Sequence, residues 1–472
     1  MFDRMIGRFS GVVVSGLAVA MVGWLGAAEV CAAAGEGWGE VGVAEVEITP
    51  ESAVRLNGYG NRRKETSEVV QPIYAKALAF GADDDPGGPS VLVTADQCIV
   101  PAAVTQAIAE RLEEEAGIPR ERFVLSVSHS HTTPMLTGAS PTIFGQPIPA
   151  PHQVNIDRYT DFFIERCVEV AQAALADREP AEVSLARGSV GFALNRRSLR
   201  GDPHGPNDHE LPTLIVKNEE GDLRAVYVMY ACHCTVVNDN VITGDWAGYT
   251  QEFIQKNHPE AIALVSIGCG ADQNPYRDGP RLQMAESHGR EIADEVSRLL
   301  RGPWRPIEPR VTTAAYREIS LAFADHPDRA EWQRRSGGSS YPAYHAQRNL
   351  ERLDRGEPLP THLDYPIQTW QLGEGDLAMV FLAGEVVVDY ALRLKRELDA
   401  DRLWVTAYAN DVSCYIPSER VLREGGYEGA GAMAVYDQPA PFAPGLEDQI
   451  VGEVREQLSE TFETQLGVDA TR

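Results

Sequence analysis

The chain of 472 residues carries 69 acidic and 42 basic side chains, which gives a formal net charge of −27 at pH 7. This excess of negative charge repels nucleic acids and anionic surfaces, so we expect no nucleic-acid partner. The length is sufficient for one large domain or two ordinary ones.

The first element in chain order is an N-terminal leader. Arg4 and Arg8 precede an apolar run over 11–28, and small residues follow as far as Ala34. This order is typical of a secretory signal peptide, so we predict removal of residues 1–34 and export to the periplasm or the extracellular space. The alternative is a helix retained as a membrane anchor, although the run is barely of spanning length. We expect no transmembrane span in the mature chain.

After the leader, short apolar runs alternate with longer amphipathic stretches. Strands are predicted over 90–100, 122–131, 223–234, 261–270, 377–385 and 403–410, and helices over 101–117, 158–177, 248–259, 281–302 and 386–400. This alternation predicts an α/β fold of mixed, largely parallel sheets flanked by helices. We interpret residues 35–472 as one domain, with the polar stretch 325–365 as an insertion or lid.

Several of the predicted strands end in polar side chains or run directly into them. They are His129 with His131, His233, Asp272 with Asn274, Glu385, and Asp411 with Tyr415. In parallel α/β sheets the functional crevice lies at the carboxyl ends of the strands. Side chains alternate between the faces of a strand, so His129 and His131 are expected to reach into the same space. Imidazole and carboxylate are zinc ligands, which indicates a metal site; a solvated polar strand end is the alternative.

Seven sequence segments contain these polar residues or lie between them along the chain. They are SVSHSHTTP (126–134), FALNRRS (192–198), YACHCTVV (230–237), GDWAGY (244–249), GCGADQNP (268–275), TWQLGEGDLAMVFLAGE (369–385) and DVSCYIPSERVLREGGYEG (411–429). Together they resemble the catalytic N-terminal domain of the neutral/alkaline non-lysosomal ceramidases. The resemblance implies the fold of that domain and the hydrolysis of an amide or related acyl bond in a small-molecule or lipid-like substrate. A peripheral encounter with a membrane is compatible with such a substrate.

The resemblance also implies roles for individual residues. It implies a zinc ion bound by four ligands, which are His129, His233, Glu385 and Tyr415. It implies that His131 and Arg196 hold the substrate carbonyl or the developing oxyanion, and the alternative for both is support of neighbouring groups. Tyr427 is expected to line the pocket.

One departure from the family pattern changes the expected mechanism. Asn274 stands where the family has a nucleophilic serine, and an amide cannot act as an alkoxide. We therefore predict direct attack by zinc-bound water, with no acyl-enzyme. Asp272 is interpreted either as a proton-transfer group or as a loop hydrogen-bonding group. The chain ends at Arg472, so we expect no C-terminal β-sandwich domain of the kind that full-length ceramidases carry.

Other interpretations stay open at this point. A non-catalytic binding or sensing protein on the same scaffold would keep the metal for structural reasons. A zinc-activated water could instead hydrolyse a phosphoester. Six cysteines follow the leader and permit one or two disulfides, whereas Cys232 and Cys234 are interpreted as packing residues or disulfide partners.

Overall fold

The largest element of the computed structural model, which describes residues 37–197 and 205–464, is a nine-stranded sheet. Its strand order is β11-β10-β9-β7-β1-β4-β5-β6, with β13 paired to β7. The strands are β1 (Trp38–Glu47), β4 (Tyr74–Phe80), β5 (Ser90–Ala95), β6 (Phe123–Val127), β7 (Glu179–Ser189), β9 (Glu210–Lys217), β10 (Leu223–Tyr230), β11 (Ile262–Ile267) and β13 (Arg305–Pro306). The predicted leader lies outside the described residues.

A second sheet has the strand order β14-β15-β16-β18. Its strands are β14 (Val311–Ala322), β15 (His362–Leu372), β16 (Leu377–Leu382) and β18 (Leu403–Thr406). Three short pairs complete the sheets: β2 (Val54–Arg55) with β3 (Glu65–Thr66), β8 (Ala193–Asn195) with β12 (Gln273–Pro275), and β17 (Glu385–Val386) with β19 (Tyr415–Ile416). The last two pairs carry candidate site residues.

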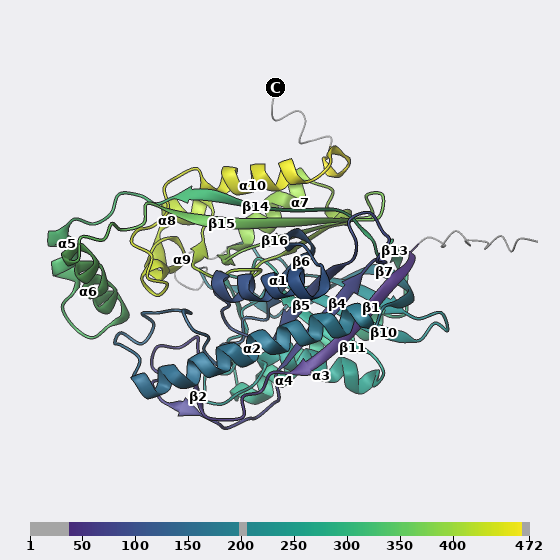
Figure 1. Cartoon of the computed structure of the whole chain (residues 1–472), viewed down its shortest axis with the longest axis horizontal. Coiled ribbons are helices and arrows are strands. Elements are labelled where there is room, and N and C mark those ends of the chain that lie inside the picture. Colours follow the sequence, from purple (N-terminus) through teal and green to yellow (C-terminus); the bar gives the residue numbers. More distant parts are fainter. Residues whose placement is uncertain (1–36, 198–204, 465–472) are drawn as a thin grey trace, which may run out of the picture. The chain divides into compact units, whose positions relative to one another are not determined.

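Helices cover the outer faces of the sheets. The α-helices are α1 (Ala102–Ala116), α2 (Ala150–Ala176), α3 (Asp245–Asn257), α4 (Arg281–Leu299), α5 (Arg329–Arg335), α6 (Tyr341–Asp354), α7 (Val388–Glu397), α8 (Glu419–Glu424), α9 (Gly426–Gly429) and α10 (Leu446–Gln457). Helix α2 packs on β1, β4 and β5, and α10 packs on β14 and β15 (Figure 1). None of the helices in the described ranges is long and apolar enough to cross a membrane.

Most central strands are apolar on both faces because both faces are covered. On β16, Leu377, Met379 and Phe381 share a core with the large sheet, where Trp404 of β18 stacks on Tyr227 of β10 with ring centroids 4.7 Å apart. The alternate residues of β16 belong to the core that also contains helix residues. In the sequence, these strands therefore appear as continuous runs of apolar residues.

The α/β class with helices flanking mixed sheets is confirmed, but the expectation of largely parallel pairing is wrong. Antiparallel neighbours predominate, and β5–β6, β10–β11 and β16–β18 are the parallel pairs within the two larger sheets as described. Continuous apolar runs are typical of parallel strands buried on both faces. Here the two-sided burial comes instead from packing one sheet on another, with helices outside.

The three parallel pairs are the βαβ units of the fold. Helix α1 connects β5 to β6, α3 connects β10 to β11, and α7 connects β16 to β18. Parallel neighbours need such a crossover, whereas antiparallel strands can be joined by a short turn. The polar residues that end β6, β10, β11 and β16 therefore leave the sheets at the carboxyl ends of βαβ strands.

The polar stretch interpreted as an insertion contains two helices. It connects β14 to β15, whose antiparallel register runs as far as Ala322 opposite His362. Helices α5 and α6 lie between those two ends and contact each other at the left of Figure 1. The insertion thus leaves the second sheet at the end of an otherwise continuous pair of strands.

Candidate metal centre and active site

The two histidines after β6 lie in a turn rather than on the strand. β6 ends at Val127, and His129 has a left-handed backbone with φ of 54°. The expectation that strand alternation aligns His129 and His131 is therefore wrong. Their imidazoles converge nevertheless, with the two Nε2 atoms 2.9 Å apart. A left-handed non-glycine residue costs on the order of 1 kcal/mol and is concentrated at functional sites.

His233 reaches the same place from the loop after β10. A parallel bridge joins Ser130 to Cys234, and the backbone N–H of His131 donates to the carbonyl of Cys234 at 3.0 Å. The loops after β6 and β10 therefore run side by side. As a result the His129 and His233 rings meet edge to face, with centroids 4.8 Å apart.

Glu385 and Tyr415 arrive together on a short parallel pair. The register of β17 and β19 places Glu385 directly opposite Tyr415. Oε2 of Glu385 lies 3.3 Å from Nε2 of His129 and 3.1 Å from Nε2 of His233. The Tyr415 hydroxyl lies 3.2 Å from Nε2 of His233. The structure thus brings together all four residues predicted as metal ligands.

Backbone carbonyls fix the tautomers of the three histidines. Nδ1 lies 2.8 Å from the Cys98 carbonyl in His129, 2.7 Å from the Gly270 carbonyl in His233, and 3.1 Å from the Gly58 carbonyl in His131. A carbonyl only accepts, so each Nδ1 carries the hydrogen. In the neutral ring, Nε2 then offers a lone pair toward the centre of the cluster. Such a second hydrogen bond on Nδ1 is usual for metal-binding histidines.

The two oxygens of the Glu385 carboxylate have different surroundings, and Oε2 is the one that faces the imidazoles. Oε1 accepts a hydrogen bond from the Tyr436 hydroxyl. Oε2 is buried and has no hydrogen-bond partner in the described part of the chain. Ligand atoms of His129, His233 and Glu385 all lie within 4.8 Å of one another. Two imidazole nitrogens and a carboxylate oxygen form the donor set of many catalytic zinc sites, so these residues fit the ion.

The charges of the cluster are strongly coupled. Burial by itself lowers the pKa of His129, but the facing carboxylate of Glu385 outweighs it and raises the pKa to about 10. Burial lowers the pKa of His233 to about 4 and that of His131 well below its usual value. Burial raises the pKa of Glu385, yet the imidazoles of His129 and His233 bring it well below its usual value. The site therefore holds a carboxylate that attracts positive charge.

Arg196 lies at the edge of the cluster beside the phenol of Tyr415. Its Nη2 donates to the Tyr415 hydroxyl at 3.1 Å, and its Nε donates to Glu428 at 2.7 Å. Glu428 also accepts from Arg197 at 2.8 Å. The guanidinium lies 5.5 Å from the ring centroid of Tyr427. Arg196 is thus a fixed cation next to the cluster, and its contact with substrate stays a prediction.

Asp272 and Asn274 differ in how their side chains are engaged. The Asp272 carboxylate accepts from Asn195 Nδ2 at 2.8 Å, from Gln273 Nε2 at 3.0 Å and from the Val388 N–H at 3.0 Å. These bonds support the interpretation of Asp272 as a loop hydrogen-bonding group. Oδ1 of Asn274 is buried and, among the described residues, has no hydrogen-bond partner.

The sequence interpretation missed three residues of the site. Tyr408 has φ of 53°, and its ring centroid lies 4.5 Å from that of His129. Tyr436 binds Glu385, and Glu428 pairs with the arginine at the edge of the cluster. Glu428 could have been found as the acid of the segment GGYEG. The sequence carries no local signal for the other two.

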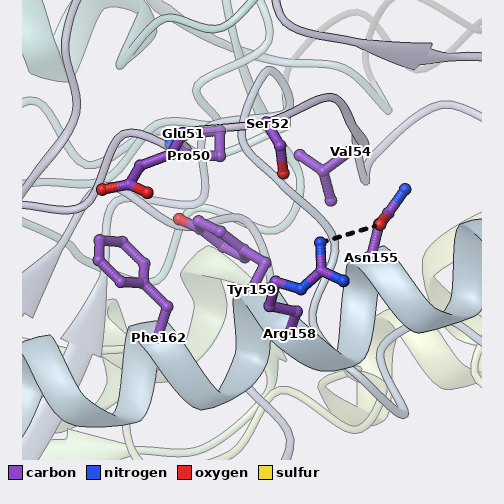
Figure 2. Close-up of a pocket in the computed structure, with 8 residues that line it drawn as sticks. All are labelled: Pro50, Glu51, Ser52, Val54, Asn155, Arg158, Tyr159 and Phe162. Carbon is purple, nitrogen blue, oxygen red and sulfur yellow. Dashed lines mark hydrogen bonds between the residues drawn. The ribbon is translucent and has the colours of Figure 1, made fainter.

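The cysteines and a surface pocket complete the polar features, and Cys98 lies beside His129 and His131. The six cysteines from Cys98 to Cys414 are all buried and free in the described ranges, so packing, not a disulfide, accounts for Cys232 and Cys234. A surface pocket of about 350 Å³ lies between residues 50–54 and α2. Figure 2 shows Arg158, Asn155 and Phe162 of α2 facing that segment. None of the candidate metal ligands lines this pocket.

Comparisons with known proteins agree with this architecture. Residues 40–266 match the family model described as neutral/alkaline non-lysosomal ceramidase, N-terminal. The fold is similar to the crystal structure of neutral ceramidase from Pseudomonas aeruginosa, with a TM-score of 0.69 and a sequence identity of 16%. The match covers 91% of this chain and 76% of that chain. A ceramidase complexed with C2 is 15% identical with a TM-score of 0.65, covering 91% and 78%. No curated protein matches the sequence. Residues 40–266 therefore belong to the family of neutral/alkaline non-lysosomal ceramidases.

Proposed function

We propose that the protein is an exported zinc-dependent hydrolase of an amide or related acyl bond. The family of residues 40–266 indicates a hydrolase of ceramide-like amide bonds. The observation that supports the zinc dependence is the buried convergence of Nε2 of His129, Nε2 of His233 and Oε2 of Glu385, the carboxylate oxygen that faces both imidazoles. Tyr415 would complete the ligand set. When bound there, zinc polarises a carbonyl and makes water nucleophilic near neutral pH.

Arg196 is the residue that would stabilise the oxyanion. Its guanidinium is held on both sides by Tyr415 and Glu428, so it needs no reorganisation when negative charge develops beside it. The carbonyl that accepts from Nδ1 of His131 leaves Nε2 of that ring as an acceptor. Burial keeps the pKa of His131 well below its usual value, so this ring suits accepting a hydrogen bond from the attacking water better than donating one to an oxyanion.

Asn274 leaves water as the nucleophile. The residue has no hydroxyl that could form an acyl-enzyme, and its amide oxygen is buried without a hydrogen-bond partner in the described ranges. That oxygen could accept a hydrogen bond from an N–H or O–H group of the substrate. We therefore propose one-step hydrolysis of an acyl-amide substrate, small or lipid-like, with Asn274 as a substrate contact.

One alternative deserves a test because a specific residue favours it. The loss of the family's serine at Asn274 is also what a non-catalytic binding or sensing protein would show. Such a protein would keep the metal cluster for structure. It would bind an acyl amide without releasing a fatty acid.

The deciding experiment measures zinc content and amide hydrolysis on the same preparations. We expect near-stoichiometric zinc and release of fatty acid from acyl-amide substrates in the wild type. His129→Ala and His233→Ala should lose both, whereas His362→Ala, at an exposed position on β15, should keep both. Zinc without hydrolysis would favour the binding protein. Undiminished hydrolysis in His233→Ala would refute the zinc site, and a covalent acyl adduct would refute the one-step mechanism.

Export is tested separately from catalysis. The proposed leader predicts a mature protein that begins after Ala34 and is found outside the cytoplasm. Mass spectrometry of the intact protein from each cell fraction measures both properties. A full-length chain in the cytoplasmic fraction alone would contradict the proposal.

A further inference from the structure

Two consecutive residues connect the metal cluster to the insertion. The Tyr436 hydroxyl donates to Oε1 of Glu385, whose other oxygen faces the imidazoles. The next residue, Asp437, turns to helix α6 of the insertion. A hydrogen bond on the rear oxygen of a carboxylate orients the oxygen that meets the metal. The position of Tyr436 is therefore important for the ligand geometry of Glu385.

Helix α6 holds Asp437 with a row of basic side chains. Arg348 donates to its carboxylate through Nε at 3.0 Å and Nη2 at 2.8 Å, and Arg352 donates through Nη1 at 3.2 Å and also through Nη2. Nε2 of His345 lies 3.9 Å away, but it accepts a hydrogen bond from Asn349 and burial lowers its pKa to about 4, so the two arginines supply the positive charge. The spacing of three and four residues places these groups on one face of the helix. The Asp437 side chain is only 7% exposed, so its charge depends on these partners.

The backbone at Asp437 is strained in a way that needs support. Its φ of 60° lies in the left-handed region, which Asp and Asn tolerate better than other non-glycine residues. The turn is closed behind it, where Gln438 N–H donates to the Met433 carbonyl at 3.0 Å and Gln438 Nε2 donates to the Ser413 carbonyl at 3.2 Å. This conformation fixes the direction in which the preceding Tyr436 leaves the backbone.

The base of the insertion is attached to the same segment. Phe323 forms an antiparallel bridge with Phe442, and the Ala324 N–H donates to the Pro441 carbonyl at 2.8 Å. The segment from Tyr436 to Phe442 therefore contacts α6 near one end and the residues just before the insertion at the other. A displacement of α6 would reach this segment through Asp437.

We propose that Asp437 is a positioning residue through which α6 controls the metal site. Its ion pairs with Arg348 and Arg352 hold the left-handed turn, and the turn presses the Tyr436 hydroxyl against Glu385. The insertion thereby tunes the affinity and geometry of the bound metal without touching it. This inference rests on the metal site of the proposed function.

The test compares metal binding by the full-length mature protein and by five variants, two of which are controls. Tyr436→Phe removes the hydroxyl and should weaken zinc binding by roughly 10- to 100-fold. In Asp437→Asn the new residue still tolerates a positive φ but carries no charge, so this variant tests the contribution of the ion pairs alone. It should weaken zinc binding by roughly 10-fold and alter the visible absorption of the cobalt-substituted protein. Arg352→Gln should act in the same direction.

Two controls separate the outcomes. Arg355→Ala, on the same insertion but paired with the exposed Glu357, should bind zinc as the wild type does. The double variant Asp437→Asn with Tyr436→Phe should be no weaker than Tyr436→Phe alone, because both changes act through one hydrogen bond. Arg352 is 23% exposed, so its variant tests the link if Asp437→Asn unfolds.

The outcomes are distinguishable from those of the proposed function. A wild type that binds no zinc overturns both proposals. Wild-type zinc affinity in Asp437→Asn and Arg352→Gln, with a weakened Tyr436→Phe, overturns the link to α6 alone. Additive losses in the double variant would show that Asp437 acts on stability and not through Tyr436, which also overturns it.

Discussion

Glu385 lies directly opposite Tyr415 in the parallel register of β17 and β19. Two neighbouring backbones, and not flexible loops, therefore set the spacing of the carboxylate and the phenol that face His233. A site on paired strands is held more precisely than one on loops. The pair is only two residues long on each strand, so small backbone changes next to it should displace the side chains of Glu385 and Tyr415.

The register predicts a severe effect of neutralising Glu385. Glu385→Gln keeps the shape but removes the charge that faces the two imidazoles, so zinc affinity should fall by more than roughly 100-fold. Isothermal titration with zinc measures this loss. Glu424→Gln, at the end of α8, is the matched control and should leave affinity unchanged. Equal affinity in both variants would show that Glu385 is not a ligand.

Gly384 should be required for the approach of β17 to β19. It has φ of 76°, and a Cβ there would lie 2.8 Å from the Cys414 carbonyl oxygen. Gly384→Ala should therefore lower the free energy of unfolding by more than about 1 kcal/mol. Gly452→Ala, inside α10 with open space around the added methyl, should instead raise it by roughly 0.5–1 kcal/mol. Urea unfolding measures both changes. An unchanged free energy of unfolding in Gly384→Ala would contradict the requirement for glycine where β17 approaches β19.

Arg196 should matter for catalysis and not for metal retention. Arg196→Lys keeps the charge but cannot donate to Tyr415 and Glu428 at once, so kcat should fall by roughly 100-fold or more with zinc content unchanged. Arg197→Lys is the matched control, because Arg197 shares Glu428 but is bonded on its other side to Glu424. Similar kcat losses in the two variants would assign Arg196 to structure alone.

The sequence predicted the parts of the fold that are local. Apolar runs separated by amphipathic helices identified the three βαβ units, and these units carry His129, His233 and Glu385 at their strand ends. Strand β14 was missed because half-exposed and polar residues such as Arg317 and Glu318 interrupt its apolar pattern. The pairing direction was mistaken because burial on both faces does not distinguish a parallel strand from an antiparallel one packed between layers.

The candidate site was predicted from residue types, and its geometry was not. The convergence of His129 and His131 depends on a left-handed turn after β6, which no strand periodicity indicates. Tyr436 and Asp437 were not predicted because their partners lie on distant segments, namely Glu385 and helix α6. Contacts of this kind follow from how the insertion packs on the site, and a single sequence does not encode them locally.

The final prediction concerns stability and a buried carboxylate outside the cluster. Burial raises the pKa of Asp245 to about 6, although the N–H groups of Val237 and Trp246 donate to it and Arg277 lies near it. The folded pKa lies above the unfolded value, so the folded state binds the proton more tightly. The buried charge therefore does not destabilise the fold below about pH 4, where Asp245 is protonated in both states. Its destabilising effect is complete above about pH 6, where Asp245 is ionised in both states.

Asp245→Asn should remove that dependence on pH. In the wild type, protonation of Asp245 adds on the order of 3 kcal/mol to the free energy of unfolding as the pH falls from about 6 to 4. Asp245→Asn is expected to be less stable at low pH, because its amide faces two N–H donors, and to show a flatter profile. Urea unfolding at several pH values measures the difference between the profiles, with Asp83→Asn as the exposed control. If the free energy of unfolding depended on pH in the same way in wild type and Asp245→Asn, the titration of Asp245 would not account for the change between about pH 4 and 6.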